Sequence, residues 1–328
     1  MVILMCTCID FKTKDFYFGR TLDLEYRYKE QVCITPRGYN FNLKNGNKIK
    51  TKYALIGIAT VIKDYPMYYE ACNEKGLCMA GLNFPKTCVY NDPLEGKLNI
   101  TPFELIPYFL GLYKSVKEVK EEIKNLNITN LSYMEGFPLT SLHFMFSDCK
   151  ESIVVEQTID GLKVYDNPVG VMTNNPSFDY QIKNLNNYMT LTASYGKNNF
   201  ANNIKLEPYG VGMGAIGLPG DYSPASRFVK ACFIKQNSVC DDDEISSVTQ
   251  FFHILDSVSF VKGAIITQNN RYDITTYSCC INASKGIYYY KTYYNNQINR
   301  VMLNDSNMNS NKLTIYDLCL EQNINSIN

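Results

Sequence analysis

Strand-like stretches follow one another in runs along this chain, and helix-like stretches come in pairs, which restricts the folds that it can adopt. Cys6 to Phe11 alternates as a strand does, and after a turn at 12–15 the segment 16–18 returns beside it. Apolar stretches at 53–62 and 81–84 indicate further strands. A wound parallel sheet needs regular alternation of strands and helices, and that alternation is missing. The chain is therefore predicted to be α+β, with helices covering antiparallel sheets.

Capping signals mark where the helices begin. Thr101 is followed by Pro102 and then by Glu104, which together form a capping box with proline in the first turn. Further helices are predicted at 115–125, 223–236 and 242–256.

Two hairpins are predicted from their turn residues. Asp160-Gly161 and Asn295-Asn296 each separate two apolar, strand-like stretches. No internal repeat and no linker-like segment interrupts the pattern, so residues 6–328 are predicted to form a single domain.

Charge and composition exclude several functions. The 328 residues include 32 basic and 32 acidic side chains, and this balance favours neither nucleic acid nor an acidic membrane surface as a partner. No apolar run approaches the roughly 18 residues that a membrane helix needs. The opening Met1–Met5 lacks the basic flank and the longer apolar core of a secretory signal. A cytoplasmic location is expected.

Cysteine is frequent and histidine is scarce. None of the twelve cysteines forms a Cys-x-x-Cys pair, and both histidines are far from any close cysteine pair, so no zinc site of usual spacing is expected. Most of the thiols are interpreted as small buried groups in a reducing compartment. His143 lies in an apolar run and His253 follows two phenylalanines. Both are interpreted as core or boundary residues, so a catalytic base has to come from elsewhere.

One glycine-rich segment imitates a cofactor motif. Residues 212–217 match the spacing of the dinucleotide-binding pattern, but Leu218-Pro219-Gly220 follows at once and would break the helix that this pattern requires. The segment is interpreted as a tight loop. Neither an organic cofactor nor a metal is predicted.

Cys6 is the strongest candidate nucleophile. A cysteine at a mature N-terminus carries its own base, because the α-amino group has an ordinary pKa of about 7.7–8.0 and can take the thiol proton. Arg20 and Asp23 lie on the strand that returns beside it, where Arg20 can stabilise a thiolate and Asp23 can orient the amine. Residues three apart on a strand face opposite sides, so the two face one site only if the strand ends or bulges near Gly19.

Together with several later motifs, these residues make the chain resemble the choloylglycine hydrolase family, which contains bile salt hydrolases and penicillin V acylases. The resemblance extends from about Met5 to Leu303, and its motifs occur in the family's order. These motifs are Met5-Cys6-Thr7, Gly19-Arg20 with Asp23, Asn73-Glu74-Lys75-Gly76-Leu77, Gly81-Leu82-Asn83-Phe84-Pro85, Val155-Glu156-Gln157-Thr158, Met172-Thr173-Asn174-Asn175-Pro176, Gly217-Leu218-Pro219-Gly220-Asp221 with Pro224-Ala225-Ser226-Arg227-Phe228, and Gly286-Ile287-Tyr288-Tyr289-Tyr290.

The resemblance implies a four-layer αββα N-terminal-nucleophile fold and a set of site residues. Cys6 is then the nucleophile, supported by Arg20 and Asp23. Asn83 and Asn174 correspond to the oxyanion-hole residues, whose amide donors stabilise the charged tetrahedral intermediate. Arg227 matches the family's second active-site arginine.

The resemblance also implies the substrate class, a glycine- or taurine-conjugated bile acid. The bile-salt-cleaving branch is similar to this chain in having asparagine where Asn83 stands, whereas a penicillin V acylase branch tends to have tyrosine. The expected pocket residues are apolar or aromatic, as a steroid requires, although a phenoxyacetyl group would fit the same walls. They are Leu22, Ile62, Tyr133, Met134 and Phe137.

Met1–Leu4 is the departure from the family pattern, because the match begins at Met5. Either Met5 is the true first residue, or Met1–Met5 is a leader that is removed to expose Cys6. If it is retained, the amine is absent and the rival reading is a non-catalytic protein that binds amphipathic acids. Penicillin V acylase or another N-acyl amidase remains the alternative enzyme. A homotetramer is implied only by the resemblance.

Overall fold

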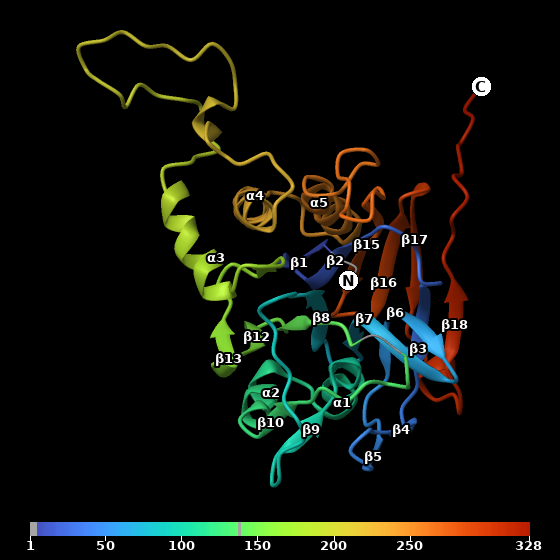
Figure 1. Ribbon diagram of the computed structural model, residues 1–328. Helices are drawn as coiled ribbons and strands as arrows, with labels where there is room; N and C mark the ends of the chain where they lie inside the picture. Colours follow the sequence, from blue (N-terminus) through green and yellow to red (C-terminus); the bar gives the residue numbers. More distant parts are fainter. Residues whose placement is uncertain (1–4, 137–138) are drawn as a thin grey trace.

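The computed structural model describes residues 5–136 and 139–328, and it shows four stacked layers (Figure 1). Two antiparallel sheets pack face to face, and helices cover the outer face of each sheet. This arrangement confirms the α+β fold class and the αββα architecture.

The first sheet has six strands in the order β14-β1-β2-β15-β16-β17, and the second has eight in the order β13-β12-β11-β8-β7-β6-β3-β18. The strands of the first sheet are β1 (Met5–Lys12), β2 (Phe16–Leu24), β14 (Val171–Met172), β15 (Ile274–Asn282), β16 (Ile287–Thr292) and β17 (Asn295–Met302). The strands of the second are β3 (Gln31–Thr35), β6 (Leu55–Ile62), β7 (Tyr65–Asn73), β8 (Cys78–Asn83), β11 (Leu142–Ser147), β12 (Ser152–Thr158), β13 (Gly161–Asp166) and β18 (Thr314–Asp317). Two small ribbons add β4 (Asn40–Asn42), β5 (Lys48–Lys50), β9 (Leu98–Ile100) and β10 (Leu126–Ile128).

The α-helices α4 and α5 cover the first sheet, and α1 and α2 lie on the far side of the second sheet (Figure 1). The α-helices are α1 (Leu105–Leu112), α2 (Val116–Ile123), α3 (Phe178–Asn184), α4 (Pro224–Asn237), α5 (Glu244–Asp256) and α6 (Asp305–Met308). Short 3-10 helices are η1 (Pro102–Glu104), η2 (Leu185–Tyr188) and η3 (Met213–Ala215).

Most of the expected helix starts are confirmed by their caps. Ser115, Ser223 and Asp243 each accept an N–H of the first helical turn, from Glu118, Ser226 and Ser246 respectively. The capping box at Thr101 is present, but it opens η1 before α1 begins.

Two local expectations differ from the structure. The C-terminal hairpin turns at Tyr293-Tyr294, two residues before the predicted Asn295-Asn296, because β16 ends at Thr292 and the hydroxyl of Thr292 accepts the N–H of Asn295. The helix α3 was not predicted at all.

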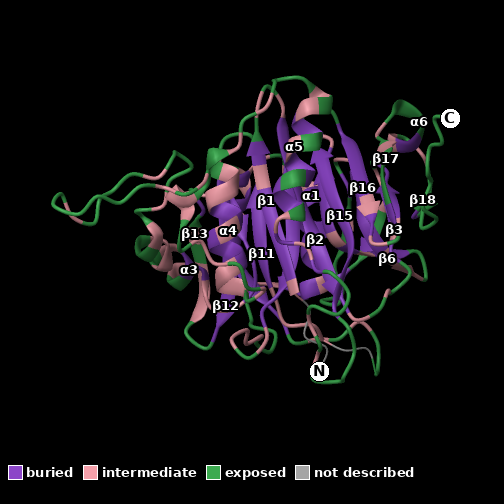
Figure 2. Ribbon diagram, turned by 90° about the horizontal axis from the view of Figure 1, so that it is seen from above, coloured by how far each residue is buried: buried purple, intermediate pink, exposed green. Residues whose placement is uncertain are grey.

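Two apolar cores hold the layers together, and the central strands of both sheets are almost entirely buried (Figure 2), whereas the edge strands β13, β17 and β18 are more exposed. One core fills the space between the sheets and under α4 and α5, where Phe18, Met145 and Phe228 are at most 1% exposed. The other joins the second sheet to α1, where the rings of Phe109 and Phe146 meet edge to face at 5.2 Å. Cys6 lies in the first core, so the candidate nucleophile is surrounded by packed, buried side chains.

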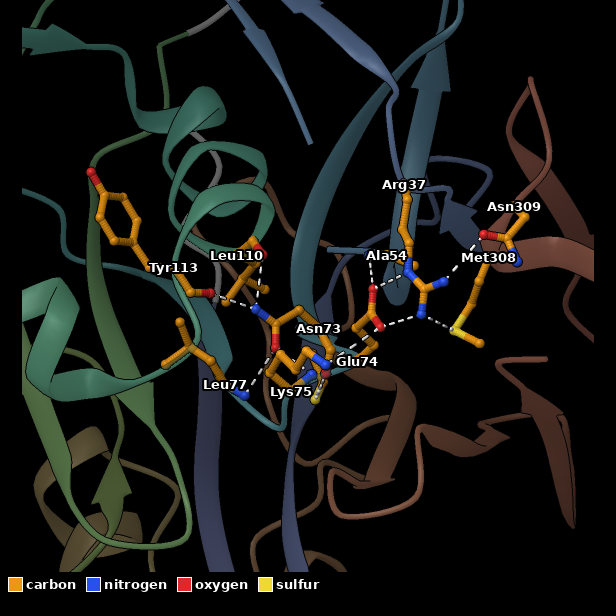
Figure 3. A network of polar contacts seen from close by, with 11 residues as sticks. Arg37, Ala54, Asn73, Glu74, Lys75, Leu77, Leu110, Tyr113, Met308 and Asn309 are labelled. Carbon is orange, nitrogen blue, oxygen red and sulfur yellow. Dashed lines mark hydrogen bonds and ion pairs between the residues drawn. The ribbon is translucent and has the colours of Figure 1, made fainter. Parts of the chain in front are cut away.

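One of the sequence motifs has a structural role far from Cys6. Asn73 is the last residue of β7, and its carboxamide oxygen accepts the N–H groups of Lys75 and Leu77 in the connection to β8 at 3.0 and 3.1 Å. Its Nδ2 donates to the carbonyl oxygens of Leu110 and Tyr113 at the end of α1 (Figure 3). Glu74 extends the same network to Arg37. The motif thus ties a sheet to its covering helix.

The segment between η2 and α4 projects away from the layered body as a long arm (Figure 1). Large apolar side chains point to solvent along it, including Phe200 at 82%, Tyr209 at 91% and Val211 at 90% exposure. The glycine-rich segment 212–217 lies at the base of this arm. It contains only the short η3 and is followed by irregular chain, which confirms that it is a loop.

Candidate active site

Cys6 lies on β1, between β14 and β2, and is 1% exposed. Its partner across the hairpin is Leu22, and Cys8 is opposite Arg20. Because side chains alternate along a strand, these four side chains share the face that is turned toward the second sheet. The thiol of Cys6 therefore points into the interface between the two sheets.

Arg20 contacts the thiol directly. Its Nη2 donates to the Sγ of Cys6, while its Nη1 donates to the carbonyl oxygen of Gly81 at 2.7 Å. The guanidinium is 1% exposed, and Glu70 on β7 supplies a buried counter-charge 3.9 Å from its Nε. A fixed positive charge against sulfur stabilises the thiolate form.

Glu70 is a functional neighbour that sequence reasoning missed. It is completely buried, and its carboxylate accepts the hydroxyls of Tyr277 at 2.7 Å and Tyr288 at 2.5 Å from the opposite sheet. A lone acidic residue inside the apolar strand 65–73 was the available signal, because a buried carboxylate needs a partner.

Asp23 lies on the opposite face of β2 from Arg20. Its carboxylate accepts the hydroxyls of Thr21 at 3.1 Å and of Thr275 at 2.6 Å. The expected bulge in β2 is wrong, because β2 pairs with β1 without a break from Phe16 to Asp23. Gly19 instead permits close approach of β15, since a Cβ there would lie 2.0 Å from the carbonyl oxygen of Cys279. Arg20 and Asp23 therefore lie on opposite faces of β2, and it is Arg20 that contacts the thiol of Cys6.

Arg227 comes from α4, 221 residues after Cys6 in the chain. Its Nη1 donates to the carbonyl oxygen of Cys6 at 2.7 Å and to the hydroxyl of Thr7 at 2.6 Å. Its Nη2 donates to the Oδ1 of Asn174 at 2.8 Å. Arg227 therefore fixes the backbone of the nucleophile from the helical side.

Asn174 faces the backbone nitrogen of Cys6. Its Oδ1 accepts that N–H at 2.9 Å, and its Nδ2 donates to the carbonyl oxygen of Asn83 at 2.8 Å. This geometry fixes the position of the backbone nitrogen of Cys6. Asn83 fits the oxyanion role more directly, because its Nδ2 is buried and donates to no atom of the described residues.

Burial dominates the titration of this site. It raises the pKa of Cys6 to about 11 while residue 5 is still attached, although the Arg20 guanidinium acts in the opposite direction. Burial also raises the pKa of Asp23 to about 6, against the opposing effect of Arg227. Asp273, which the sequence did not single out, has its pKa raised to about 7 by burial and by the nearby Asp23.

An apolar pocket of about 270 Å³ opens directly onto Cys6. Arg20 and Asn83 border it, and so do Leu22 and Ile62 from the expected pocket set. The rest of its wall is mainly aliphatic and aromatic, with Tyr28, Thr60, Met67, Tyr68, Tyr69, Gly81, Pro102, Phe103, Ile106, Leu139, Thr140, Leu142 and Phe144.

The other three expected pocket residues are placed differently. Tyr133 and Met134 line a neighbouring cavity rather than this pocket. Tyr133 packs edge to face on Phe103 at 5.3 Å, so it supports the pocket wall from behind. Phe137 lies outside the described residues.

The histidines do not contact Cys6. His143 is buried, with Nδ1 3.0 Å from Glu156 and Nε2 2.8 Å from the carbonyl oxygen of Thr173, which agrees with its interpretation as a core residue. His253 is exposed on α5, so its interpretation as a core or boundary residue is wrong. In the part of the chain that the structure describes, no group of three or more His, Cys, Asp and Glu side chains is placed to hold a metal ion. Among the same residues, no helix has both the length and the apolar character needed to cross a bilayer.

Comparison with known proteins agrees with this geometry. Residues 6–316 match the family model of linear amide C–N hydrolases, choloylglycine hydrolase family. The chain belongs to this family. A bile salt hydrolase/transferase of Lactiplantibacillus plantarum is 48% identical, over 99% of this chain and all of the relative. A relative of the same name from Clostridium perfringens is 40% identical, again over 99% of this chain and all of the relative. Membership confirms the expected class, a hydrolase of C–N bonds in linear amides.

Solved structures support the fold of this choloylglycine hydrolase family member. A mutant of the conjugated bile acid hydrolase from Clostridium perfringens superposes with a TM-score of 0.92 at 40% identity, covering 99% of this chain and all of that one. Penicillin V acylase from Agrobacterium tumefaciens has a TM-score of 0.75 at 20% identity, over 96% of this chain and 92% of the other. The second likeness concerns the fold alone.

Proposed function

We propose that this protein hydrolyses the amide bond of glycine- or taurine-conjugated bile acids, releasing the free bile acid and the amino acid. The observation that carries the proposal is the position of the Cys6 thiol. It lies at the end of an apolar pocket, with the guanidinium of Arg20 on the sulfur and the buried amide of Asn83 beside it. Two relatives named bile salt hydrolase/transferase, 48% and 40% identical over 99% of this chain, support the same substrate class.

The reaction uses the α-amine of residue 6 as its base. The amine takes the thiol proton, and the sulfur attacks the substrate carbonyl to give a tetrahedral oxyanion, which the Nδ2 of Asn83 stabilises. The ammonium then returns its proton to the leaving nitrogen as the C–N bond breaks, leaving an acyl thioester on Cys6. Water hydrolyses this thioester, and the bile acid leaves. Asn174 holds the nitrogen of residue 6 through its Oδ1, and Asp23 is proposed to orient the amine.

The site residues have separable roles in this mechanism. Arg20 stabilises the thiolate, and Arg227 holds the carbonyl of Cys6 and the side chain of Asn174. The pocket supplies the apolar walls that a steroid requires, and its volume is near the lower end of the range of about 300–1,000 Å³ typical of small-molecule sites. Leu22 and Ile62 belong to that wall, while Tyr133 and Met134 support or flank it.

Two asparagine variants test the mechanism. Asn83→Ala is expected to lower kcat by about 10²–10³, because the oxyanion loses a preorganised donor. Asn174→Ala is expected to lose about as much, because the amine loses its acceptor. Both are measured as taurine release from taurocholate, with circular dichroism to verify folding. A variant within about threefold of the parent would remove that residue from the mechanism.

Turnover of penicillin V, compared with turnover of conjugated bile acids, distinguishes a bile salt hydrolase from a penicillin V acylase. The parent protein is expected to turn over taurocholate or glycocholate with a much larger kcat/KM than penicillin V. A preference for penicillin V would assign the acylase function to the same nucleophile. Saturable binding of taurocholate without turnover, by a chain that begins at Cys6, would support the non-catalytic reading.

We also propose that residues 1–5 are absent from the active form and that residues 6–328 act as one domain. The mechanism supports the first point, because only a free residue 6 carries an amine. A cytoplasmic location is supported by the twelve cysteines, which are all free, as is usual in a reducing compartment. Neither a metal nor an organic cofactor takes part in the proposed steps.

The active form is further proposed to be a homo-oligomer, a tetramer by family resemblance. The projecting arm supports this, because contiguous exposed apolar side chains are typical of association surfaces. Sedimentation equilibrium is expected to give about four chain masses for the parent protein. Replacing Phe200, Tyr209 and Val211 together by serine is expected to give smaller species. A monomeric parent protein would contradict the proposal.

A further inference from the structure

His143 connects two segments that carry site residues. It lies on β11, opposite Leu82 of β8, and its ring stacks on Phe84 with a centroid distance of 4.4 Å and an interplanar angle of 4°. Phe84 directly follows Asn83. On the other side, the Nε2 of His143 lies 2.8 Å from the carbonyl oxygen of Thr173, which directly precedes Asn174. One imidazole thus contacts the neighbours of both asparagines.

The protons on this ring follow from its partners. A carbonyl oxygen can only accept, so Nε2 must carry a proton. Nδ1 lies 3.0 Å from the Oε1 of Glu156, and this oxygen also accepts the N–H of Phe178 at 3.0 Å. The side chains of His143 and Glu156 are at most 2% exposed. Both ring nitrogens are therefore engaged, which leaves the ring unable to act as the base for Cys6.

Glu156 is held in place from a second direction. Its Oε1 meets the first N–H of α3, while its Oε2 is buried and has no hydrogen-bond partner among the described residues. The imidazole is the side chain of the described residues that pairs with this carboxylate, with Nδ1 3.0 Å from its Oε1. A buried pair of this kind fixes the orientation of the ring, as carboxylates do for other functional histidines.

We propose that His143, oriented by Glu156, is a positioning residue that sets the relative placement of Asn83 and Asn174 around the reacting carbonyl and the amine of Cys6. The proposal rests on the proposed function, because it assigns the pair to that reaction. Thr173 is also fixed by its hydroxyl, which donates to the carbonyl oxygen of Pro224 at 2.9 Å. The imidazole adds a second link between this loop and the β8 end that carries Asn83, beside the direct hydrogen bond from the Nδ2 of Asn174 to the carbonyl oxygen of Asn83.

The first test is His143→Phe, which keeps an aromatic ring against Phe84 and removes both hydrogen bonds. Misplacing the Asn83 donor lowers the rate of the chemical step much more than it weakens substrate binding. The kcat toward taurocholate is therefore expected to fall about 10- to 100-fold. KM is expected to stay within about threefold, because His143 does not border the pocket. His253→Phe, at the other and exposed histidine, is the matched control and is expected to equal the parent. An unchanged kcat, or a change in KM alone, would overturn the proposal.

The second test uses Glu156 and still applies if His143→Phe fails to fold. Glu156→Gln keeps an oxygen that can accept hydrogen bonds from the N–H of Phe178 and from Nδ1, so the ring retains its Nε2–H toward Thr173 and kcat is expected to stay within about fivefold. Glu156→Leu removes the partner and is expected to lower kcat at least tenfold at similar KM. Equal kcat values for the two variants would overturn the proposal. An active parent with unaffected variants refutes only the positioning role, whereas an inactive parent refutes the proposed function and this role with it.

Discussion

Cys6→Ala is expected to abolish taurine release from taurocholate, and Cys8→Ala is expected to keep most of it. Cys8 is the natural competitor, since it lies on the same strand face roughly 6.6 Å along the chain. It is completely buried, however, and only Cys6 borders the pocket and accepts an N–H of Arg20. The loss at Cys6 should reach the assay background, because no second nucleophile can form the thioester.

The two variants control each other, because both replace a buried thiol on β1 with a methyl group. Their far-ultraviolet circular dichroism and melting temperatures should be similar. If Cys8→Ala were inactive while Cys6→Ala retained turnover, the assignment of the nucleophile would be wrong.

A chain that keeps Met1–Met5, as verified by intact mass, is expected to be inert toward taurocholate and penicillin V alike. An attached residue turns the basic amine of Cys6 into an amide, which cannot accept the thiol proton. Burial raises the pKa of that thiol to about 11, so the thiolate fraction at pH 7 is on the order of one in ten thousand. Comparable turnover by this unprocessed chain would rule out the amine as the base.

The raised pKa of the Cys6 thiol in the unprocessed chain can be measured from the pH dependence of its alkylation by iodoacetamide. Only the thiolate reacts, so its rate in the unprocessed chain should rise about tenfold per pH unit from neutral pH and level off near pH 11. The exposed Cys149 and Cys319 serve as internal controls in peptide mass mapping. A processed chain should react far faster at pH 7, and equal rates at that pH would contradict the role of the amine.

Local sequence was sufficient for the parts of the site that lie on one hairpin. The alternation from Cys6 to Phe11 and the turn after it predicted the β1–β2 pair, and this pairing places Arg20 on the face of the thiol. The expected bulge near Gly19 was wrong because Arg20 and Asp23 were assumed to face the same side of the strand. The structure uses both faces of β2, with Arg20 on the face of the thiol and Asp23 on the other face, bonded to Thr21 and Thr275.

The remaining site depends on contacts between distant segments, which periodicity cannot reveal. The roles of Asn174 and Arg227 were accessible only through family resemblance, and neither the orientation of Asn174 toward the Cys6 nitrogen nor its bond to Arg227 followed from it. The partners of Glu70, Tyr277 and Tyr288, come from the other sheet and could be identified only from the structure. Tyr133 was expected in the pocket on its aromatic character, but its direction depends on how its loop packs against Phe103.

The central claim, that a free N-terminal Cys6 cleaves conjugated bile acids, is tested most directly by one paired measurement. Intact mass identifies a sample whose chain begins at Cys6, and chromatography of the same sample follows taurocholate, cholate and taurine. The account predicts equimolar release of cholate and taurine, which is lost in Cys6→Ala. A folded chain that begins at Cys6 and releases neither product would contradict it.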